Sequence, residues 1–179
     1  MKAPIIALSS LLLATSAHAI TPHNYVEAGF GASQLFSFNK ATNDNLSNFS
    51  TSPSLKLVVG SRLNHSRTAW FELGYNHNGV MKYGTTELSS QSVSTGFKFT
   101  TDPISYSALF IRGGVGRTWM STTTDSESSE NISNHYYGGA GLSFRLDYTR
   151  SIVLEAQHIN DAGTDEAING AYLSINQFF

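Results

Sequence analysis

The feature that most constrains this chain is an alternation of apolar and polar residues that recurs in short segments. Successive side chains of a β-strand point to opposite faces, so each segment predicts a strand with one apolar and one polar face. The segments number eight: Asn24–Leu35, Ser54–Leu63, Thr68–Asn76, Gln91–Phe99, Ser105–Trp119, Tyr136–Leu146, the stretch around Ile152–Gln157, and Ile168–Phe179.

The connections between these segments alternate in length. Polar stretches without periodicity, which we interpret as long loops, cover Phe36–Pro53, His77–Ser90 and Met120–Asn134. Tight turns are expected at Asn64–Arg67, Thr100–Pro103 and Asp147–Arg150, and Ile159–Ala167 is intermediate. Short connections on one side and long ones on the other are typical of an up-and-down barrel in an outer membrane. We therefore predict an all-β fold, an eight-stranded antiparallel transmembrane β-barrel, because an open terminal strand would leave an exposed edge.

The alternation alone does not say which face points outward. A water-soluble barrel would bury the aliphatic face, whereas a membrane barrel turns it toward lipid. In a membrane barrel the charged residues of the other face converge in the lumen, and near balance between acids and cations favours this arrangement because an unpaired buried ion is costly. The predicted lumenal charged cluster contains three acids and five cations: Glu27, Lys56, Arg62, Glu72, Lys98, Arg112, Arg145 and Glu155.

The first 19 residues have the features of a secretory signal peptide. Lys2 precedes an apolar stretch, and Ala17-His18-Ala19 supplies a cleavage site, so we expect a signal peptide over residues 1–19 and a barrel domain over residues 20–179. A retained helical anchor is the alternative, but the apolar stretch is short for a membrane span. Export fits a location in the outer membrane of a Gram-negative bacterium.

Composition excludes several classes of function. The net charge is −2, and no Lys/Arg cluster is visible, so we expect no nucleic-acid partner. The absence of cysteine removes disulfides and zinc–thiolate sites, and we expect no metal and no cofactor. Only 13% of the residues are charged, which is low for a water-soluble domain.

Three stretches resemble known bacterial barrels. Residues 71–75 (Phe-Glu-Leu-Gly-Tyr) and 110–116 (Phe-Ile-Arg-Gly-Gly-Val-Gly) are similar to the third and fifth strands of OmpA-type barrels. The final strand, with Leu173, Ile175 and the terminal Phe179, resembles the assembly signal of outer-membrane barrels, although Gln177 stands where an apolar residue is usual. The resemblance implies a monomer in contact with outer-membrane lipid and lipopolysaccharide, inserted by the barrel-assembly machinery.

The same resemblance implies a non-enzymatic role in membrane integrity or in surface interaction. As in the Ail and OmpX relatives, the extracellular loops would contact a host surface ligand, and Met120–Asn134 carries several acids for this. A narrow gated pore is an alternative, since OmpA-type barrels contain an inward salt-bridge network. Ser143 and Val153 occupy positions where that network has an acid and a base, so its switching arrangement does not carry over.

A second resemblance concerns His158. The segment His158-Ile159-Asn160, with Glu166 downstream, is similar to the catalytic segment of PagL-type lipid A deacylases. Asn160 stands at the position of the serine nucleophile, and an amide cannot form an acyl-enzyme. We therefore expect no lipid A hydrolysis, and we expect His158 to face outward with Leu154 and Ala156.

Overall fold

The computed structural model describes residues 23–37, 50–64, 66–83, 85–101, 106–124, 127–161 and 166–179. The expected signal peptide, residues 1–19, lies outside the described residues. In the part of the chain that is described, no helix is long and apolar enough to span a membrane.

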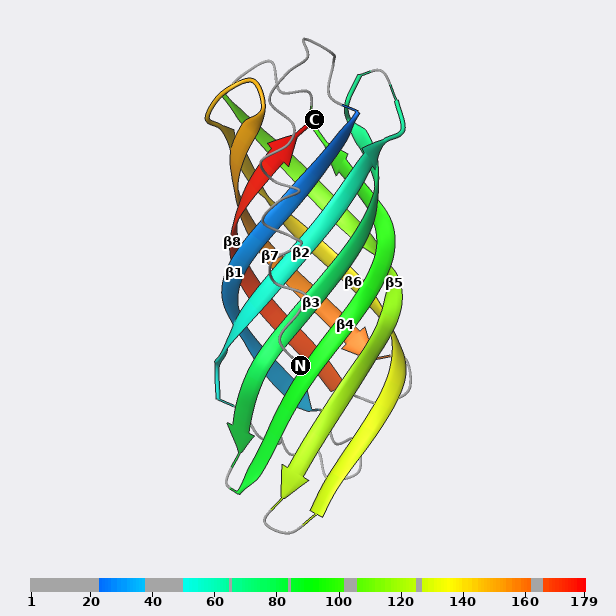
Figure 1. Ribbon diagram of the computed structural model, residues 1–179, viewed down its shortest axis with the longest axis vertical. Helices are drawn as coiled ribbons and strands as arrows, with labels where there is room; N and C mark the ends of the chain where they lie inside the picture. The colour runs from blue at the N-terminus through cyan, green and yellow to red at the C-terminus, as the bar shows by residue number, and fades with distance from the viewer. Residues whose placement is uncertain are drawn as a thin grey trace.

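The fold is a closed barrel of eight strands in which every strand pairs antiparallel with its chain neighbours, and β1 pairs with β8 (Figure 1). This confirms the predicted fold class. The strands are β1 (Asn24–Ser37), β2 (Ser52–Arg62), β3 (Ala69–Tyr83), β4 (Thr86–Thr100), β5 (Ser107–Thr124), β6 (Glu127–Arg145), β7 (Arg150–Asp161) and β8 (Glu166–Phe178).

The two ends of the barrel differ. One end, which we call the turn end, carries the connections after β2, β4 and β6 together with Phe179 (top of Figure 1). The opposite end, the hairpin end, carries the connections after β1, β3, β5 and β7. There β5 and β6 run as a long hairpin beyond the end of β7, and β4 stays paired with β5 up to Thr86↔Thr124. The strands β3 and β4 form a second, shorter hairpin (Figure 1).

The outer wall is apolar over the middle and the turn end of the barrel. Leu55 and Leu173 are 57% and 43% exposed, whereas Lys56 and Glu72, on the other face, are 2% and 1% exposed. The aliphatic face therefore points outward and the ionic face inward. This is the arrangement that a lipid environment requires, and it excludes the water-soluble alternative left open by the alternation.

Two of the predicted long connections, His77–Ser90 and Met120–Asn134, and the intermediate one, Ile159–Ala167, are wrong, because strands occupy most of them. Residues 77–83 and 86–90 continue β3 and β4, residues 120–124 and 127–134 continue β5 and β6, and residues 159–161 and 166–167 continue β7 and β8. The hairpin between β5 and β6 keeps its register from Ser107↔Phe144 to Thr124↔Glu127. At the hairpin end the chain thus forms extended sheet where the sequence suggested loops.

Candidate functional site

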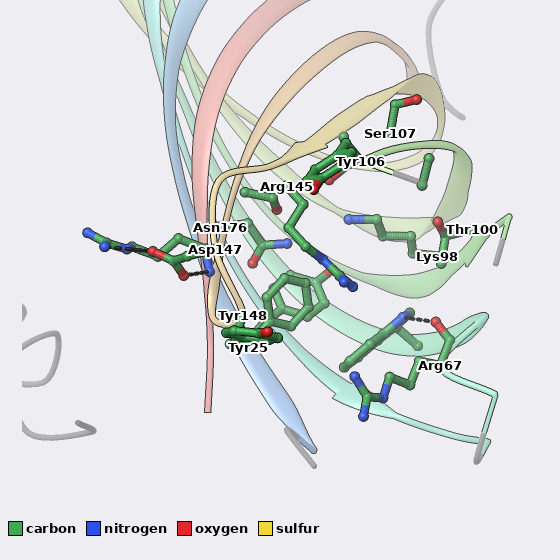
Figure 2. Close-up of a pocket in the computed structure, with 16 residues that line it drawn as sticks. Tyr25, Arg67, Lys98, Thr100, Tyr106, Ser107, Arg145, Asp147, Tyr148 and Asn176 are labelled. Carbon is green, nitrogen blue, oxygen red and sulfur yellow. Dashed lines mark hydrogen bonds and ion pairs between the residues drawn. The ribbon is translucent and has the colours of Figure 1, made fainter. Parts of the chain in front are cut away.

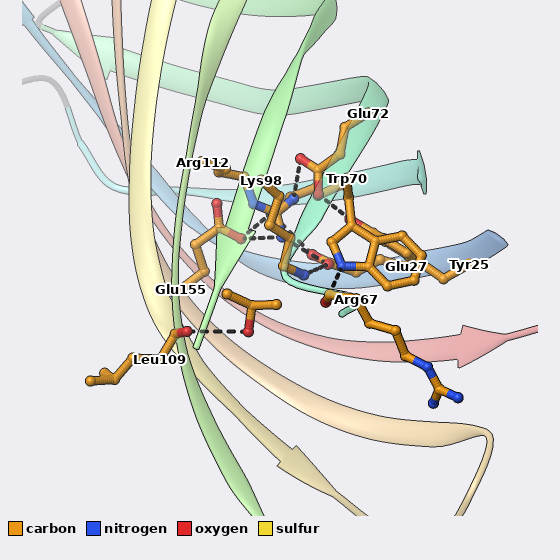
Figure 3. Close-up of polar contacts among 11 residues, drawn as sticks. Tyr25, Glu27, Arg67, Trp70, Glu72, Lys98, Leu109, Arg112 and Glu155 are labelled. Atoms are coloured by element: carbon orange, nitrogen blue, oxygen red, sulfur yellow. Dashed lines mark hydrogen bonds and ion pairs between the residues drawn. The ribbon is translucent and has the colours of Figure 1, made fainter. Parts of the chain in front are cut away.

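Six charged side chains meet inside the barrel. Figure 3 labels all of them except Lys56. Each comes from a different strand, so closure of the barrel brings them together across large separations in sequence. They are Glu27 on β1, Lys56 on β2, Glu72 on β3, Lys98 on β4, Arg112 on β5 and Glu155 on β7. We call these six residues the ionic layer.

Arg112 and Glu27 form the centre of the ionic layer. Arg112 Nη2 lies 2.8 Å from Glu27 Oε2 and 3.3 Å from Glu155 Oε2, and its Nη1 lies 3.5 Å from Glu72 Oε2. One guanidinium therefore contacts all three acids, a use that its planar set of donors permits. Glu27 also forms ion pairs with two lysines: Lys56 Nζ lies 3.1 Å from its Oε1, and Lys98 Nζ lies 3.7 Å from its Oε2.

The remaining contacts complete the ionic layer. Lys56 pairs with Glu155, and the Tyr25 hydroxyl donates a hydrogen bond to Glu72. The ammonium of Lys98 lies 4.5 Å from the centre of the Phe110 ring and 4.9 Å from that of Tyr25. Aromatic faces attract a cation at such distances, so the two rings stabilise the Lys98 ammonium in addition to its ion pair with Glu27.

The ionic layer holds three acids and three cations, all nearly inaccessible to solvent. This balance is what a buried cluster requires, because an uncompensated ion in the interior is strongly destabilising. Two members of the predicted cluster do not belong to it. Arg62 lies at the turn end, where its Nη2 is 3.0 Å from His23 Nδ1, and Arg145 is exposed at the mouth of the barrel. Both have the inward parity of their strands but stand at strand ends, where water replaces the interior.

Glycines on β6 leave room for the ionic layer. A Cβ on Gly139 would lie 2.8 Å from Glu155 Oε1, and one on Gly141 would lie 2.6 Å from the Phe110 ring. The cavity beside Lys56, Glu72 and Arg112 measures only about 10 Å³. Since a single water needs about that much space, the interior at this level is filled by side chains.

A second group of side chains fills the lumen at the hairpin end, and the sequence analysis missed it. These residues, which we call the apolar layer, are Leu35, Met81, Leu88, Met120, Tyr137, Ile159 and Ile168. Most of them stand in segments interpreted as loops. The signal that could have found them is a period-two pattern with polarity reversed: Met81 and Leu88 point inward, whereas Lys82 and Glu87 point outward.

The residues of the supposed deacylase motif lie on the outer wall near the hairpin end. His158 is exposed, as expected, and its Nδ1 lies 2.6 Å from Asn169 Oδ1. Asn160 Nδ2 donates to the Tyr136 hydroxyl. Neither contact supplies a nucleophile. The side chain of Glu166 lies outside the described residues.

Two further predictions concern the inner face and the last strand. Ser143 and Val153 both lie inward, and Val153 is fully buried, so no acid–base pair occupies these positions. Leu173 and Ile175 point outward on β8, as the proposed assembly signal requires, and Phe179 is 41% exposed at its end. The Phe179 carbonyl accepts hydrogen bonds from the His23 and Asn24 amides, which ties the end of the chain to β1.

Comparisons with known proteins agree with this geometry. The model of a family described as outer membrane protein β-barrel domain matches residues 5–178. The chain has no match among curated proteins. Solved structures of other outer-membrane barrels share the fold. Neisserial surface protein A has a TM-score of 0.72 at 14% identity, with 87% of this chain and 97% of that chain covered.

The N-terminal β-barrel domain of Pseudomonas aeruginosa OprF has a TM-score of 0.64 at 10% identity, with 88% and 98% covered. For Ail, the attachment invasion locus protein of Yersinia pestis, the TM-score is 0.60 at 14% identity, with 89% and 100% covered. At these identities the likeness concerns the fold.

Proposed function

This chain belongs to the family of outer membrane β-barrel domains of Gram-negative bacteria, and on that premise we propose that it is a sealed, non-enzymatic barrel that presents its long hairpin to surface ligands. Membrane barrels of this type place short turns in the periplasm and long connections outside the cell. The turn end is then periplasmic, and the hairpin end is extracellular.

The observation that carries the proposal is the length of the β5–β6 hairpin. The last pair between β6 and β7 is His135↔Asp161, yet β5 and β6 remain paired up to Thr124↔Glu127. At about 3.3 Å per residue, the hairpin extends well beyond the closed part of the barrel. A paired hairpin has already lost most of its backbone entropy, so a ligand that binds it avoids the ordering penalty of a flexible loop.

Charge indicates which kind of ligand the hairpin favours. Glu127 and Glu130 lie near its tip, and the neighbouring Lys82 is paired with Glu87 at 2.5 Å. Ail has been solved in complex with the heparin analogue sucrose octasulfate. A sulfated ligand needs cations, and the exposed cation Arg117 lies at the base of the hairpin and not near its tip. The tip is therefore better suited to a basic protein surface.

The filled lumen supports a contribution to membrane integrity in place of conduction. The ionic layer and the apolar layer close the interior at two levels, so an ion would have to displace both. In planar bilayers, we expect the purified protein to give no channel steps. Steps that disappear in Glu72→Ala would favour the gated pore.

The test of the surface role is removal of the hairpin tip. Residues 122–129 are replaced by Asn-Gly, which joins the paired residues Ser121 and Glu130 by a tight turn and keeps Met120 of the apolar layer. Cells carrying the full chain should bind an immobilised extracellular-matrix preparation and fail to bind heparin-agarose, and the shortened protein should lose matrix binding. Matrix binding that survives the replacement would overturn the proposal.

The non-enzymatic part of the proposal has a separate test. Lipopolysaccharide incubated with the purified protein should keep all its acyl chains by mass spectrometry, because Asn160 offers no hydroxyl for acyl transfer. Loss of an acyl chain with the unchanged protein, but not with the His158→Ala variant, would establish a hydrolase.

A further inference from the structure

A pocket of about 80 Å³ opens at the turn end, between the ionic layer and the solvent (Figure 2). Its wall combines cations with aromatic rings. Arg67, Arg145 and the end of Lys98 supply positive charge, and Tyr106 and Tyr148 stand at its edge, 85% and 93% exposed. We propose that this pocket binds the carboxylate of an acidic sugar on the periplasmic side of the membrane.

The first step of the argument is the charge of the pocket. Among the ion pairs of the described residues, none joins Arg67 or Arg145 to an acid. Asp147, the acid in the lining, is already held by Arg150 at 2.6 Å and by the Thr149 amide at 2.8 Å. Two guanidinium groups are therefore free to bind an anion, and a carboxylate matches their planar donors.

The second step is the backbone at Arg67. Its φ of 60° is the one positive value among the described non-glycine residues. The turn that holds it is fixed by Asn64, whose Oδ1 accepts the Thr68 and Ala69 amides at 3.0 and 3.2 Å. A left-handed conformation strains a residue with a side chain, and glycine would relieve this strain. Arginine at this position supplies a guanidinium at the mouth that the turn itself does not need.

The third step is a pair of buried polar atoms. Ser151 Oγ and Asn176 Oδ1 line the pocket, are buried, and have no hydrogen-bond partner. Buried polar atoms are normally satisfied. The Ser151 hydroxyl can donate to a carboxylate, whereas Asn176 Oδ1 can only accept from a ligand hydroxyl, so the pair fits a carboxylate with a hydroxyl group beside it. A cavity of this size holds only a few heavy atoms, since one water accounts for about 30 Å³. The carboxylate and the neighbouring hydroxyl group then enter the pocket, and the rest of the sugar ring lies against Tyr106 and Tyr148 at its edge.

The experiment titrates the full-length, detergent-solubilised protein with glucuronate, glucose, acetate and inorganic phosphate, using calorimetry. We expect glucuronate to bind most tightly, acetate more weakly and glucose not measurably. Arg145→Gln and Arg67→Gly should each weaken glucuronate binding about tenfold or more, because each removes a charge-assisted contact. Tyr148→Ala should weaken glucuronate and leave acetate unchanged.

Lys82→Gln serves as the control, because it removes one exposed cation at the opposite end of the barrel. It should bind glucuronate like the unchanged protein, and heat-dependent mobility on gels verifies that every variant is folded. The proposal is overturned by absence of glucuronate binding, by full binding in both arginine variants, or by phosphate that binds as tightly as glucuronate. None of these results depends on the β5–β6 hairpin.

Discussion

The ionic layer and the apolar layer fill the same lumen by opposite means. Around the ionic layer the outer wall is apolar, and the charged side chains point into the lumen toward one another. Around the apolar layer the outer wall is mixed. Lys82, Glu87 and Asn169 face outward, but Val80, Trp119 and Ile132 do so as well, at 48%, 43% and 57% exposed. The strands and their period are continuous between the two levels, so what changes is the solvent outside. The lumen inverts from ionic to apolar at the level where charged side chains appear on the outer wall, and this inversion marks where the wall leaves lipid and enters water.

The largest expected effect comes from removing one cation from the ionic layer, which tests whether this layer is as deeply buried as the comparison requires. Arg112→Met leaves Glu27, Glu72 and Glu155 with only Lys56 and Lys98 as counter-charges. We expect a loss of about 3–5 kcal/mol in the free energy of unfolding, measured by urea titration in lipid vesicles. Lys82→Met, which removes an exposed cation, should change the stability by at most about 0.5 kcal/mol. Equal effects of the two changes would mean that the ionic layer is not energetically buried.

The apolar layer should respond to lost volume instead of lost charge. Ile168→Ala removes a side chain that is 4% exposed, and we expect a loss of about 2–5 kcal/mol in the same titration. Ile132→Ala at the same end is the matched control, because Ile132 is 57% exposed, and its effect should stay within about 0.5 kcal/mol. A small effect at Ile168 would show that the hairpin end is not packed as a core.

The boundary between lipid and water can be located with a charge on the outer wall. Leu173→Lys places a cation at lipid level and should cost about 2–4 kcal/mol, whereas Asn169→Lys, two outward positions along β8, should cost at most about 1 kcal/mol. Stability is again measured in vesicles. Equal penalties at the two positions would place the inversion, and with it the membrane surface, elsewhere on the wall.

The smallest effect is expected in the turn after β6, outside both layers. Hydrogen bonds from the Thr149 amide and from the Arg150 side chain lower the pKa of Asp147 to about 2. Because the folded pKa lies below the ordinary value of about 3.9, this carboxylate stabilises the fold above that pH, and its contribution is lost as the pH falls through about 2. Asp147→Asn should therefore be slightly less stable than the unchanged protein at pH 7 and equal to it near pH 2. A difference that grows on acidification would contradict this.

The comparison also explains how far the sequence could lead. A pattern of outward apolar residues and inward charged residues is typical of a membrane barrel. This pattern predicts the eight strands, the closure of the barrel and the inward positions of Glu27, Lys56, Glu72, Lys98, Arg112 and Glu155. It failed at Met81, Leu88 and Met120. Each of these inward apolar residues has an outward polar neighbour (Lys82, Glu87 and Ser121), and this is the reverse of the pattern expected of a strand that faces lipid. The longest strands were therefore shortened in the prediction.

The ionic layer itself was only partly predictable. Strand parity places Arg62 and Arg145 inward, but parity carries no information on depth along the axis, and both lie where the interior meets water. Tyr25 was missed as a partner of Glu72 for a related reason: the contact joins β1 to β3 across the lumen, and no local pattern encodes it. The pocket at the turn end depends on three separate connections and was not visible in the sequence.

The unequal strand lengths give the cylinder a preferred side. The strands β5 and β6, with 18 and 19 residues, stand opposite β1 and β2, with 14 and 11, so the wall is high on one flank and low on the other. A barrel with strands of equal length would present the same wall height to neighbouring proteins on all sides. The barrel is therefore asymmetric within the plane of the membrane. A neighbouring membrane protein that packs against the high flank contacts a taller wall than one that packs against the low flank.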